Sequence, residues 1–224
     1  RRTALKTAAA AGALSVAGMP ALAAPKHGGT YRLGLTGGNT SDTWDSRTHS
    51  DAYMINMGHG CVFECLTEVS AEGELVGELA TGWEASADAK VWTFDLRKGV
   101  KFHNGKAFGA DDVIASMNMH VEEDASSAAK PIVANVAEMK KLSDHQVQFV
   151  LKNGSADFPY LVSDYHICIF PAGQIAEAIA NGIGTGPYKV VSFEPGVRTL
   201  ATKFEEHWDA DNRGYFAEVE GIYI

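Results

Sequence analysis

Residues 91–96 of the chain alternate strictly along an extended backbone. The apolar side chains of Trp92, Phe94 and Leu96 point to one side, and the polar side chains between them point to the other. A period of two is typical of a β-strand with one covered face and does not suit an amphipathic helix. Residues 145–151 alternate in the same way. The sequence therefore predicts a sheet with a buried apolar face, and we expect a β-meander in this part of the chain.

Other strands and helices are expected on both sides of these segments. Asn104-Gly105 and Glu194-Pro195-Gly196 have the composition of tight turns. Further strands are expected at residues 30–35, 100–103, 167–170, 187–193, 198–204 and 219–224. Helices are expected at residues 51–69, from 111 to about 121, at 158–161 and at 174–180. Because strands and helices do not alternate regularly, the sequence predicts an α+β fold with mixed sheets.

The amino-terminal residues have the composition of an export signal. A twin arginine stands at residues 1–2, and an apolar run rich in Ala and Gly follows. Residues 21–23 supply a small-x-small cleavage pattern, so we expect a signal peptide at residues 1–23 and a mature protein that begins at Ala24. A membrane-spanning helix is the alternative, but the run contains Pro20 and is barely long enough. The signal predicts export by the twin-arginine route to the periplasm, where the absence of a lipid-attachment cysteine after the signal predicts a free protein.

The expected mature protein is strongly acidic. The whole chain carries a net charge of −9, and removal of the three basic residues of the signal changes this charge to −12. An anionic surface argues against nucleic acid or anionic lipid as a partner. Hydrophobic residues make up 46% of the chain, which is enough for a buried core, and we expect a monomer.

The three cysteines are Cys61, Cys65 and Cys168, an odd number that leaves at least one unpaired. A spacing of four puts Cys61 and Cys65 on one face of the predicted helix, where packing as small apolar residues is favoured over a disulfide or a metal pair. His59 completes the one cluster in the sequence that could hold a soft metal, but helical spacing places it off that face. We therefore predict no metal ligands and no cofactor.

Short patterns that suggest catalysis lack their companions. Ser127 and Lys130 have the Ser-x-x-Lys spacing of penicillin-interacting enzymes, but the other motifs of those enzymes are missing. The sequence contains no Gly-x-Ser-x-Gly and no His-Glu-x-x-His motif. The Gly-rich residues 182–187 precede a predicted strand instead of following one, so they do not form a dinucleotide-binding loop. We predict no catalytic residues and a protein that is not an enzyme.

Longer motifs occur together and in a fixed order along the chain. They occupy residues 64–67, 79–84, 92–105, 110–113, 185–190 and 204–208. On these motifs the chain resembles the dipeptide, oligopeptide and nickel class of extracytoplasmic solute-binding proteins, known as family 5, over nearly its whole mature length. It departs from the family's usual pattern at Asn104, where Asp is common, and at Gly109, where Thr is common.

The resemblance implies a two-lobed fold of the periplasmic-binding-protein type. Residues 24–60 and 171–224 are then expected in the first lobe and residues 61–170 in a smaller inserted domain, with the second lobe missing from the sequence. The chain also stops within the predicted strand 219–224, which we expect to need partners from later in the sequence. For the intact protein the resemblance implies a receptor of an ABC importer that closes around a small solute, most often a peptide, and delivers it to a permease in the cytoplasmic membrane.

Two segments are candidate ligand contacts by this resemblance. Backbone groups and an aromatic face can hold a peptide without selecting its side chains, which suits a loop after the first strand. The candidates are Gly37, Gly38, Asn39, Thr40, Ser41, Asp42 and Trp44 in that loop, and Asp164, Tyr165 and His166 at the end of the inserted domain. An ordinary surface loop with a packing tryptophan is the alternative.

The cargo stays open among peptides, nickel chelates, haem, opines and sugars. A different class of function is an exported metal-binding protein or metal-dependent enzyme that loads its ion before export.

Overall fold

The computed structural model of the chain describes residues 26–224. The expected signal peptide, residues 1–23, and the expected mature start at Ala24 lie outside the described residues. Within the described part of the chain, no helix combines the length and the apolar character that a membrane span needs.

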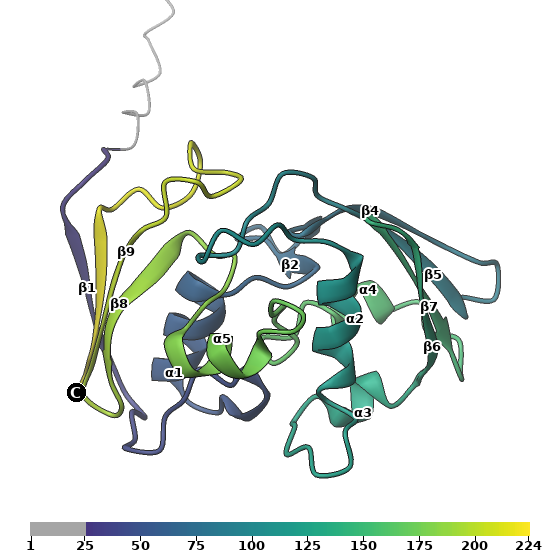
Figure 1. The fold of residues 1–224 in the computed structure, drawn as a ribbon, viewed down its shortest axis with the longest axis horizontal. Coiled ribbons are helices and arrows are strands. Elements are labelled where there is room, and N and C mark those ends of the chain that lie inside the picture. The colour runs from purple at the N-terminus through teal and green to yellow at the C-terminus, as the bar shows by residue number, and fades with distance from the viewer. Residues whose placement is uncertain (1–25) are drawn as a thin grey trace, which may run out of the picture.

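One mixed sheet of four strands lies at one end of the molecule (Figure 1). Its order is β1 (Thr30–Leu35), β10 (Glu218–Tyr223), β9 (Arg198–Lys203) and β8 (Tyr188–Glu194). Strand β10 runs parallel to β1 and antiparallel to β9, and β8 and β9 form the predicted hairpin. The expectation that the last strand needs partners from later in the sequence is wrong, because both neighbours of β10 precede it in the chain.

A second sheet of four antiparallel strands lies at the opposite end. Its order is β4 (Ala80–Ala85), β5 (Val91–Leu96), β7 (Gln146–Leu151) and β6 (Val136–Ser143). The apolar face predicted for β5 is buried, and the ring of Phe94 meets the ring of Phe149 edge-on at 5.6 Å. The short strands β2 (Thr67–Val69) and β3 (Leu75–Gly77) form a separate antiparallel pair between the two larger sheets. Together the sheets confirm the predicted α+β fold with mixed sheets.

Short helices fill the space between the two large sheets (Figure 1). Helix α1 (Ala52–Met57) and helix α5 (Ile175–Asn181) lie near the mixed sheet, and α2 (Ala110–Asn118) lies near the antiparallel one. The remaining helices are a 3-10 turn η1 (Ser46–Thr48), α3 (Lys130–Val133) and α4 (Phe158–Leu161). A wider π-helical turn, η2 (Gly58–Val62), continues directly from α1.

The predicted helix at residues 51–69 is therefore too long. It ends at Val62, and the following segment is extended because its backbone pairs with other parts of the chain. The carbonyl of Glu64 accepts from the amide of Ile169 at 3.0 Å, and the carbonyl of Cys65 accepts from the amide of Leu79 at 3.1 Å. The helix face expected to carry Cys61 and Cys65 does not form.

Two predicted strands are also absent from the described residues. Residues 100–103 belong to a turn that has one isolated bridge, between Lys101 and Ala107. Residues 167–170 are extended but have no ladder, and they are fixed through single hydrogen bonds to Glu64 and Ser116. Strand β6, in contrast, has no alternating apolar pattern, because most of its residues are exposed along an outer edge.

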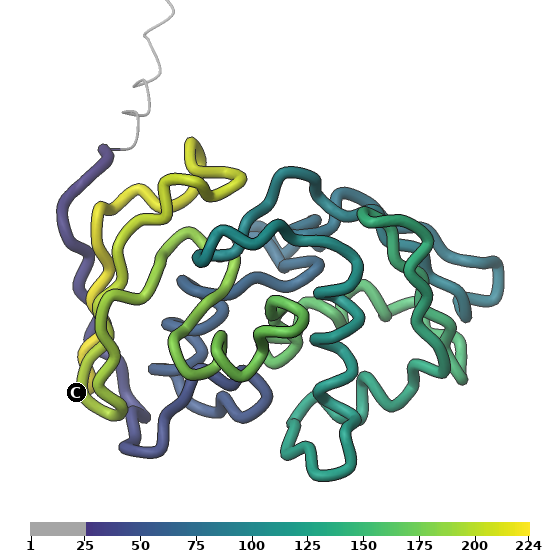
Figure 2. Tube along the Cα trace, in the orientation of Figure 1, coloured from purple at the N-terminus to yellow at the C-terminus, as the bar shows by residue number. Residues whose placement is uncertain are grey.

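Two hydrophobic cores lie side by side. One forms beneath the antiparallel sheet and includes Phe94, Phe149 and Phe158. The other forms between α1 and the mixed sheet and includes Trp44 and Phe63. Cys65 and Cys168 belong to the second core, and their neighbours Leu66 and Ile167 belong to the first, so two adjacent extended segments connect the cores (Figure 2).

Candidate functional site

The loop that follows β1 is held by its own polar groups. The amide of Asn39 donates to Asp42 Oδ2 at 2.8 Å, and the amide of Asp42 donates to the carbonyl of Asn39 at 3.0 Å. The Asn39 side-chain oxygen accepts from both the amide and the hydroxyl of Ser41, each at 3.0 Å. Side chains of this type form such local turns readily. The loop Gly37–Asp42 is thus exposed and ordered by internal hydrogen bonds.

Two glycines let the loop approach its neighbours closely. Gly37 has a φ of +93°, and a Cβ at this position would lie 2.5 Å from the Cβ of Asp51. A Cβ on Gly38 would lie 3.0 Å from the ring of Tyr223, which ends β10. The loop therefore lies against the carboxyl-terminal strand on one side and against the start of α1 on the other.

A polar hollow of about 550 Å³ lies beside this loop. Four predicted residues line it, namely Gly37, Asn39, Ser41 and Asp42. Its other walls come from the segment between the loop and α1, including Asp45, His49 and Asp51. Burial and the hydrogen bond from Asn39 act in opposite directions on the pKa of Asp42, and burial together with the neighbouring Asp51 charge raises it. The hollow is acidic and suits a positively charged group.

The acidic residues Asp45 and Asp51 were not among the site residues predicted from the sequence. Asp51 Oδ1 accepts from the amide of Met54 at 3.0 Å and so caps α1. Asp45 pairs with Arg47 at 2.8 Å and accepts from its amide, which fixes η1. Asp51 stands at the start of the helix predicted at residues 51–69, where Asp is typical of a helix cap, and this position was the available signal. No predicted helix begins near Asp45.

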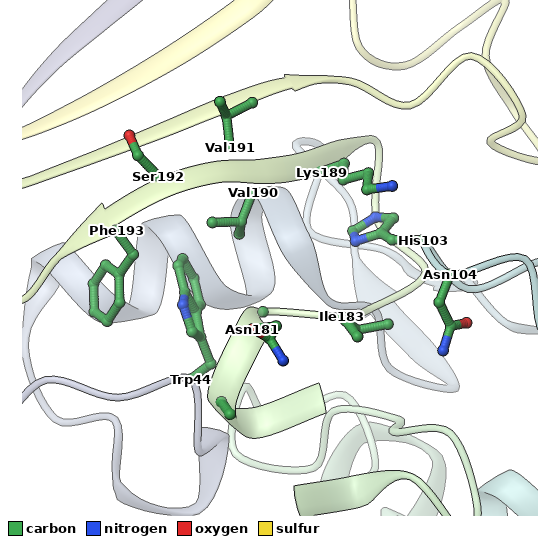
Figure 3. Close-up of a pocket in the computed structure, with 12 residues that line it drawn as sticks. Trp44, His103, Asn104, Asn181, Ile183, Lys189, Val190, Val191, Ser192 and Phe193 are labelled. Atoms are coloured by element: carbon green, nitrogen blue, oxygen red, sulfur yellow. The ribbon is translucent and has the colours of Figure 1, made fainter. Parts of the chain in front are cut away.

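Trp44 differs from the rest of the predicted loop. It is 1% exposed, and its ring lies 4.7 Å from the ring of Phe193 and 6.2 Å from that of Phe63. Figure 3 shows Trp44 beside Phe193 and Val190. The ring fills the core under β8, so its faces are occupied by the protein itself.

The second predicted segment, Asp164–His166, contacts the chain between the loop and α1. Asp164 accepts at 2.9 Å from the amide of His166 and lies 2.7 Å from its Nδ1. The Nε2 of His166 bonds to the carbonyl of His49 at 2.8 Å, and the hydroxyl of Ser46 donates to the carbonyl of His166 at 2.8 Å. The structure thus brings Asp164–His166 against the wall of the acidic hollow. Tyr165 packs its ring on His166 at a centroid distance of 4.0 Å.

Another pocket, of about 410 Å³, lies between α5 and β8 (Figure 3). Of the predicted site residues, Trp44 alone lines it. His103 at its rim accepts at Nδ1 from the amide of Gly184 at 3.2 Å, so its Nε2 carries the proton and donates to the carbonyl of Gly186 at 2.9 Å. Burial lowers the pKa of His103 to about 4. His103 is neutral and holds the turn at 101–107 against the Gly-rich segment.

The chain matches the family model described as "Bacterial extracellular solute-binding proteins, family 5 Middle" over residues 74–224. This chain belongs to family 5 of the bacterial extracellular solute-binding proteins. Family 5 is a family of binding proteins and not of enzymes, which agrees with the prediction from the sequence.

Curated relatives support the family 5 assignment. The dipeptide-binding protein of Escherichia coli K12 is 31% identical over 163 residues, which are 60% of this chain and 30% of that protein. The nickel-binding periplasmic protein of the same organism is 29% identical over 155 residues, which are 66% of this chain and 29% of that protein. The chain therefore spans about a third of the length of these family 5 relatives.

The fold agrees with solved structures of the same kind. The periplasmic binding protein AgaA of A. tumefaciens R10, solved with agropinic acid, superposes with a TM-score of 0.81 at 24% identity. The match covers 88% of this chain and 40% of AgaA. This likeness shows that the family 5 chain has part of the fold of a periplasmic binding protein.

Proposed function

We propose that the chain is the amino-terminal part of a receptor of an ABC importer. It binds a peptide or a similar small solute outside the cytoplasmic membrane and delivers it to a membrane permease. The observation that supports this most directly is the family 5 match over residues 74–224, together with an acidic hollow at the predicted ligand loop. The family's usual role supplies the permease as partner.

The placement of the two lobes is part of the proposal. Residues 24–60 and 171–224 form the first lobe, residues 61–170 form the inserted domain, and a second lobe continues past Ile224. The amide of Ile224 donates to the carbonyl of Leu35 at 3.0 Å, directly before the loop Gly37–Asp42. In this proposal the second lobe faces the loop and the hollow, and the two lobes close on solute between them.

The acidic lining favours a solute with a positively charged group. Asp42, Asp45 and Asp51 all line the hollow, and an incoming ammonium group relieves the repulsion between Asp42 and Asp51. The amino end of a peptide carries such a charge. We therefore assign the solute contacts of this lobe to Gly37–Asp42, with Asp164–His166 as the support behind them, and leave out Trp44 because it is buried.

The protein works as a periplasmic monomer without a cofactor in this proposal. The twin arginine at residues 1–2 supports export by the twin-arginine route.

A thermal-shift screen of the full-length mature protein tests the proposal, because binding to the native state raises the unfolding temperature. The screen uses short peptides, nickel complexes, haem and sugars. We expect a shift with peptides. Asp42→Asn should weaken peptide binding by about 3–10-fold, which is roughly 1 kcal/mol for a partly exposed ionic contact.

Glu84→Gln is the matched control, because it removes one exposed carboxylate from β4 at the opposite end of the molecule. A shift with another solute class but not with peptides would reject the proposal that the solute is a peptide. No shift with any class would reject the proposal that the protein is a solute receptor.

A further inference from the structure

Three potential metal ligands meet where the chain passes from one core to the other. They are His59 in η2, Cys65 in the extended segment after it, and Glu78 between β3 and β4. One donor atom from each lies within 4.8 Å of the donor atoms of the other two. None of these residues belongs to the acidic hollow, and the group is independent of the proposed function.

The backbone brings the three residues together. In η2 the amide of Phe63 bonds to the carbonyl of Gly58 at 3.0 Å, a π-helical spacing that ends the helix and turns the chain outward. The amide of Glu78 then donates to the carbonyl of Leu66 at 3.1 Å, and the amide of Leu79 donates to the carbonyl of Cys65. Cys65 and Glu78 are thus fixed on neighbouring extended segments.

One side chain of this group lacks a partner, whereas the other two already have contacts. Cys65 Sγ donates to the carbonyl of Asp164 at 3.4 Å, and Glu78 Oε2 accepts from the amide of Cys65 at 2.6 Å. His59 Nε2 is buried and has no hydrogen-bond partner, although it lies 3.5 Å from Glu78 Oε2. A tetrahedral zinc ion, with ligand bonds of about 2.0–2.3 Å, separates its ligand atoms by about 3.3–3.7 Å. The distance between His59 and Glu78 already falls in this range, and Cys65 Sγ needs a shift of about 1 Å or less to reach it.

The surroundings orient the carboxylate for a cation. Arg213 Nη1 lies 3.5 Å from Glu78 Oε1, while the amide of Cys65 and the ring of His59 face Oε2. Arg213 is itself paired with Glu68. One thiolate and one carboxylate offset the charge of a divalent ion, and the His59 side chain, 23% exposed, gives the ion a route from solvent.

We propose that His59, Cys65 and Glu78 form a binding site for a borderline-soft divalent cation, specifically Zn²⁺. Nitrogen, sulfur and carboxylate donors in one small cluster are the set that zinc accepts, whereas calcium and magnesium prefer oxygen alone. The ion ties η2 to the segment between β3 and β4, at the passage between the two cores. It is a resident ion and not the transported solute.

The cluster expected from the sequence was His59 with Cys61 and Cys65, and helical spacing placed His59 off the face of the two cysteines. The structure replaces Cys61 by Glu78, because Cys65 lies beyond the end of the helix. Cys61 is buried nearby, is not part of the group, and serves as an internal control.

The test uses the full-length protein, purified with reductant and stripped of metal by a chelator. Zn²⁺ is titrated in competition with a chromophoric chelator, and Co²⁺ reports thiolate ligation through its sulfur-to-cobalt absorption band. We expect one equivalent of Zn²⁺ to bind. Cys65→Ser should abolish the cobalt band, and His59→Ala should weaken zinc binding by more than the roughly 10–100-fold that loss of a supporting residue costs.

Cys61→Ser should leave the stoichiometry, the affinity and the band unchanged. His59→Ala keeps the test valid if Cys65→Ser does not fold, because His59 is the most exposed of the three ligands. The proposal is overturned if the reduced protein binds no Zn²⁺, or if Cys61→Ser and Cys65→Ser behave alike. Mass spectrometry of protein purified without reductant overturns it if Cys65 is joined to the neighbouring Cys168 by a disulfide. Peptide binding is measured separately, so failure of the zinc site leaves the receptor proposal standing.

Discussion

At residue scale, Gly37 carries two separate constraints. Its φ of +93° disfavours any side chain, and the space for a Cβ is already taken by Asp51. Gly73, in the turn between β2 and β3, shares the first constraint with a φ of +83° but has open space around it. A comparison of the two glycines therefore separates the cost of the left-handed backbone from the cost of a steric clash.

Gly37→Ala should lower the free energy of unfolding by more than Gly73→Ala does. The left-handed conformation alone costs about 1–2 kcal/mol for a residue with a Cβ. We expect about this cost at Gly73, and at Gly37 an additional cost because the loop or α1 must move. Urea unfolding of both variants measures the difference. Equal losses in the two variants would show that the contact with Asp51 relaxes without cost.

His103 makes stability depend on pH. Its pKa is lowered to about 4 from the usual 6.5, mainly by burial, so the unfolded chain binds a proton that the folded chain does not. The stabilisation is complete above about pH 6.5 and is lost as pH falls toward about 4. The loss for this residue is on the order of 3 kcal/mol.

Unfolding measured across this pH window should show a smaller slope in His103→Gln than in the parent protein. His27→Gln is the matched control, because His27 is exposed on the surface. An unchanged slope in His103→Gln would assign the acid sensitivity to other groups, among them His120, whose pKa burial also lowers to about 4.

At the scale of elements, a buried carboxylate joins the segment after β9 to the passage between the cores. Glu64 is 1% exposed, and its Oε1 lies 3.0 Å from His207 Nε2 and accepts from Trp208 Nε1 at 2.9 Å. Arg97 lies over the Trp208 ring at 3.7 Å. Glu206 in the same segment is exposed and pairs only with the exposed Lys101 among the described residues.

Glu64→Ala should destabilise the protein by about 3–5 kcal/mol, because the buried donors of His207 and Trp208 lose their acceptor. Glu206→Ala should change the free energy of unfolding by less than about 0.5 kcal/mol, as is usual for surface pairs. Thermal or urea unfolding compares the two variants. A small effect of Glu64→Ala would mean that water replaces the carboxylate.

Elements with a clear period could be predicted from the sequence. Strands β1, β5, β7, β8, β9 and β10 and helix α2 lie close to their expected ranges, because the spacing of their apolar residues or the turns beside them mark them in the sequence. Strand β6 could not be predicted, because it is fixed by pairing with β7 along a mostly exposed edge. The helix expected at residues 51–69 was too long because Phe63 and Leu66 are buried in an extended segment that mimics helical spacing.

The candidate site was predictable only in part, because some of its features depend on contacts between residues far apart in the chain. The composition of Gly37–Asp42 marks a loop, and the resemblance to the family gives it a role. The burial of Trp44 depends on Phe193, which lies 149 residues later in the chain, so no local pattern could reveal it. The meeting of His59 with Glu78 likewise depends on how distant extended segments pair.

At the scale of the whole molecule, two sheets stand at opposite ends and share a middle layer of helices (Figure 1). The cores meet at Ile183, which packs against both. Strands β5 and β7, which form the centre of one sheet, pair across 55 residues at Thr93 and Gln148. Strand β1 in the other sheet pairs with β10, and Thr30 and Glu218 are 188 residues apart. Closing the longer loop costs more entropy and slows the pairing.

Refolding should therefore protect the amides of β5 and β7 before those of β1. Pulse-labelling hydrogen exchange during refolding measures this order. Simultaneous protection of β1 and β5 would mean that the two sheets form in a single step.

The position of β10 between β1 and β9 has a consequence for newly made chains. At about 5–20 residues per second, a ribosome needs roughly 10–40 s to add the 188 residues between Thr30 and Glu218. Throughout this time β10, the strand that pairs with β1 in the described part of the chain, has not been made, and an unpaired strand can associate with another chain. Among the described residues, the first strand to be synthesised is the last to be protected, so a nascent chain that stalls before β10 is the form most prone to aggregate.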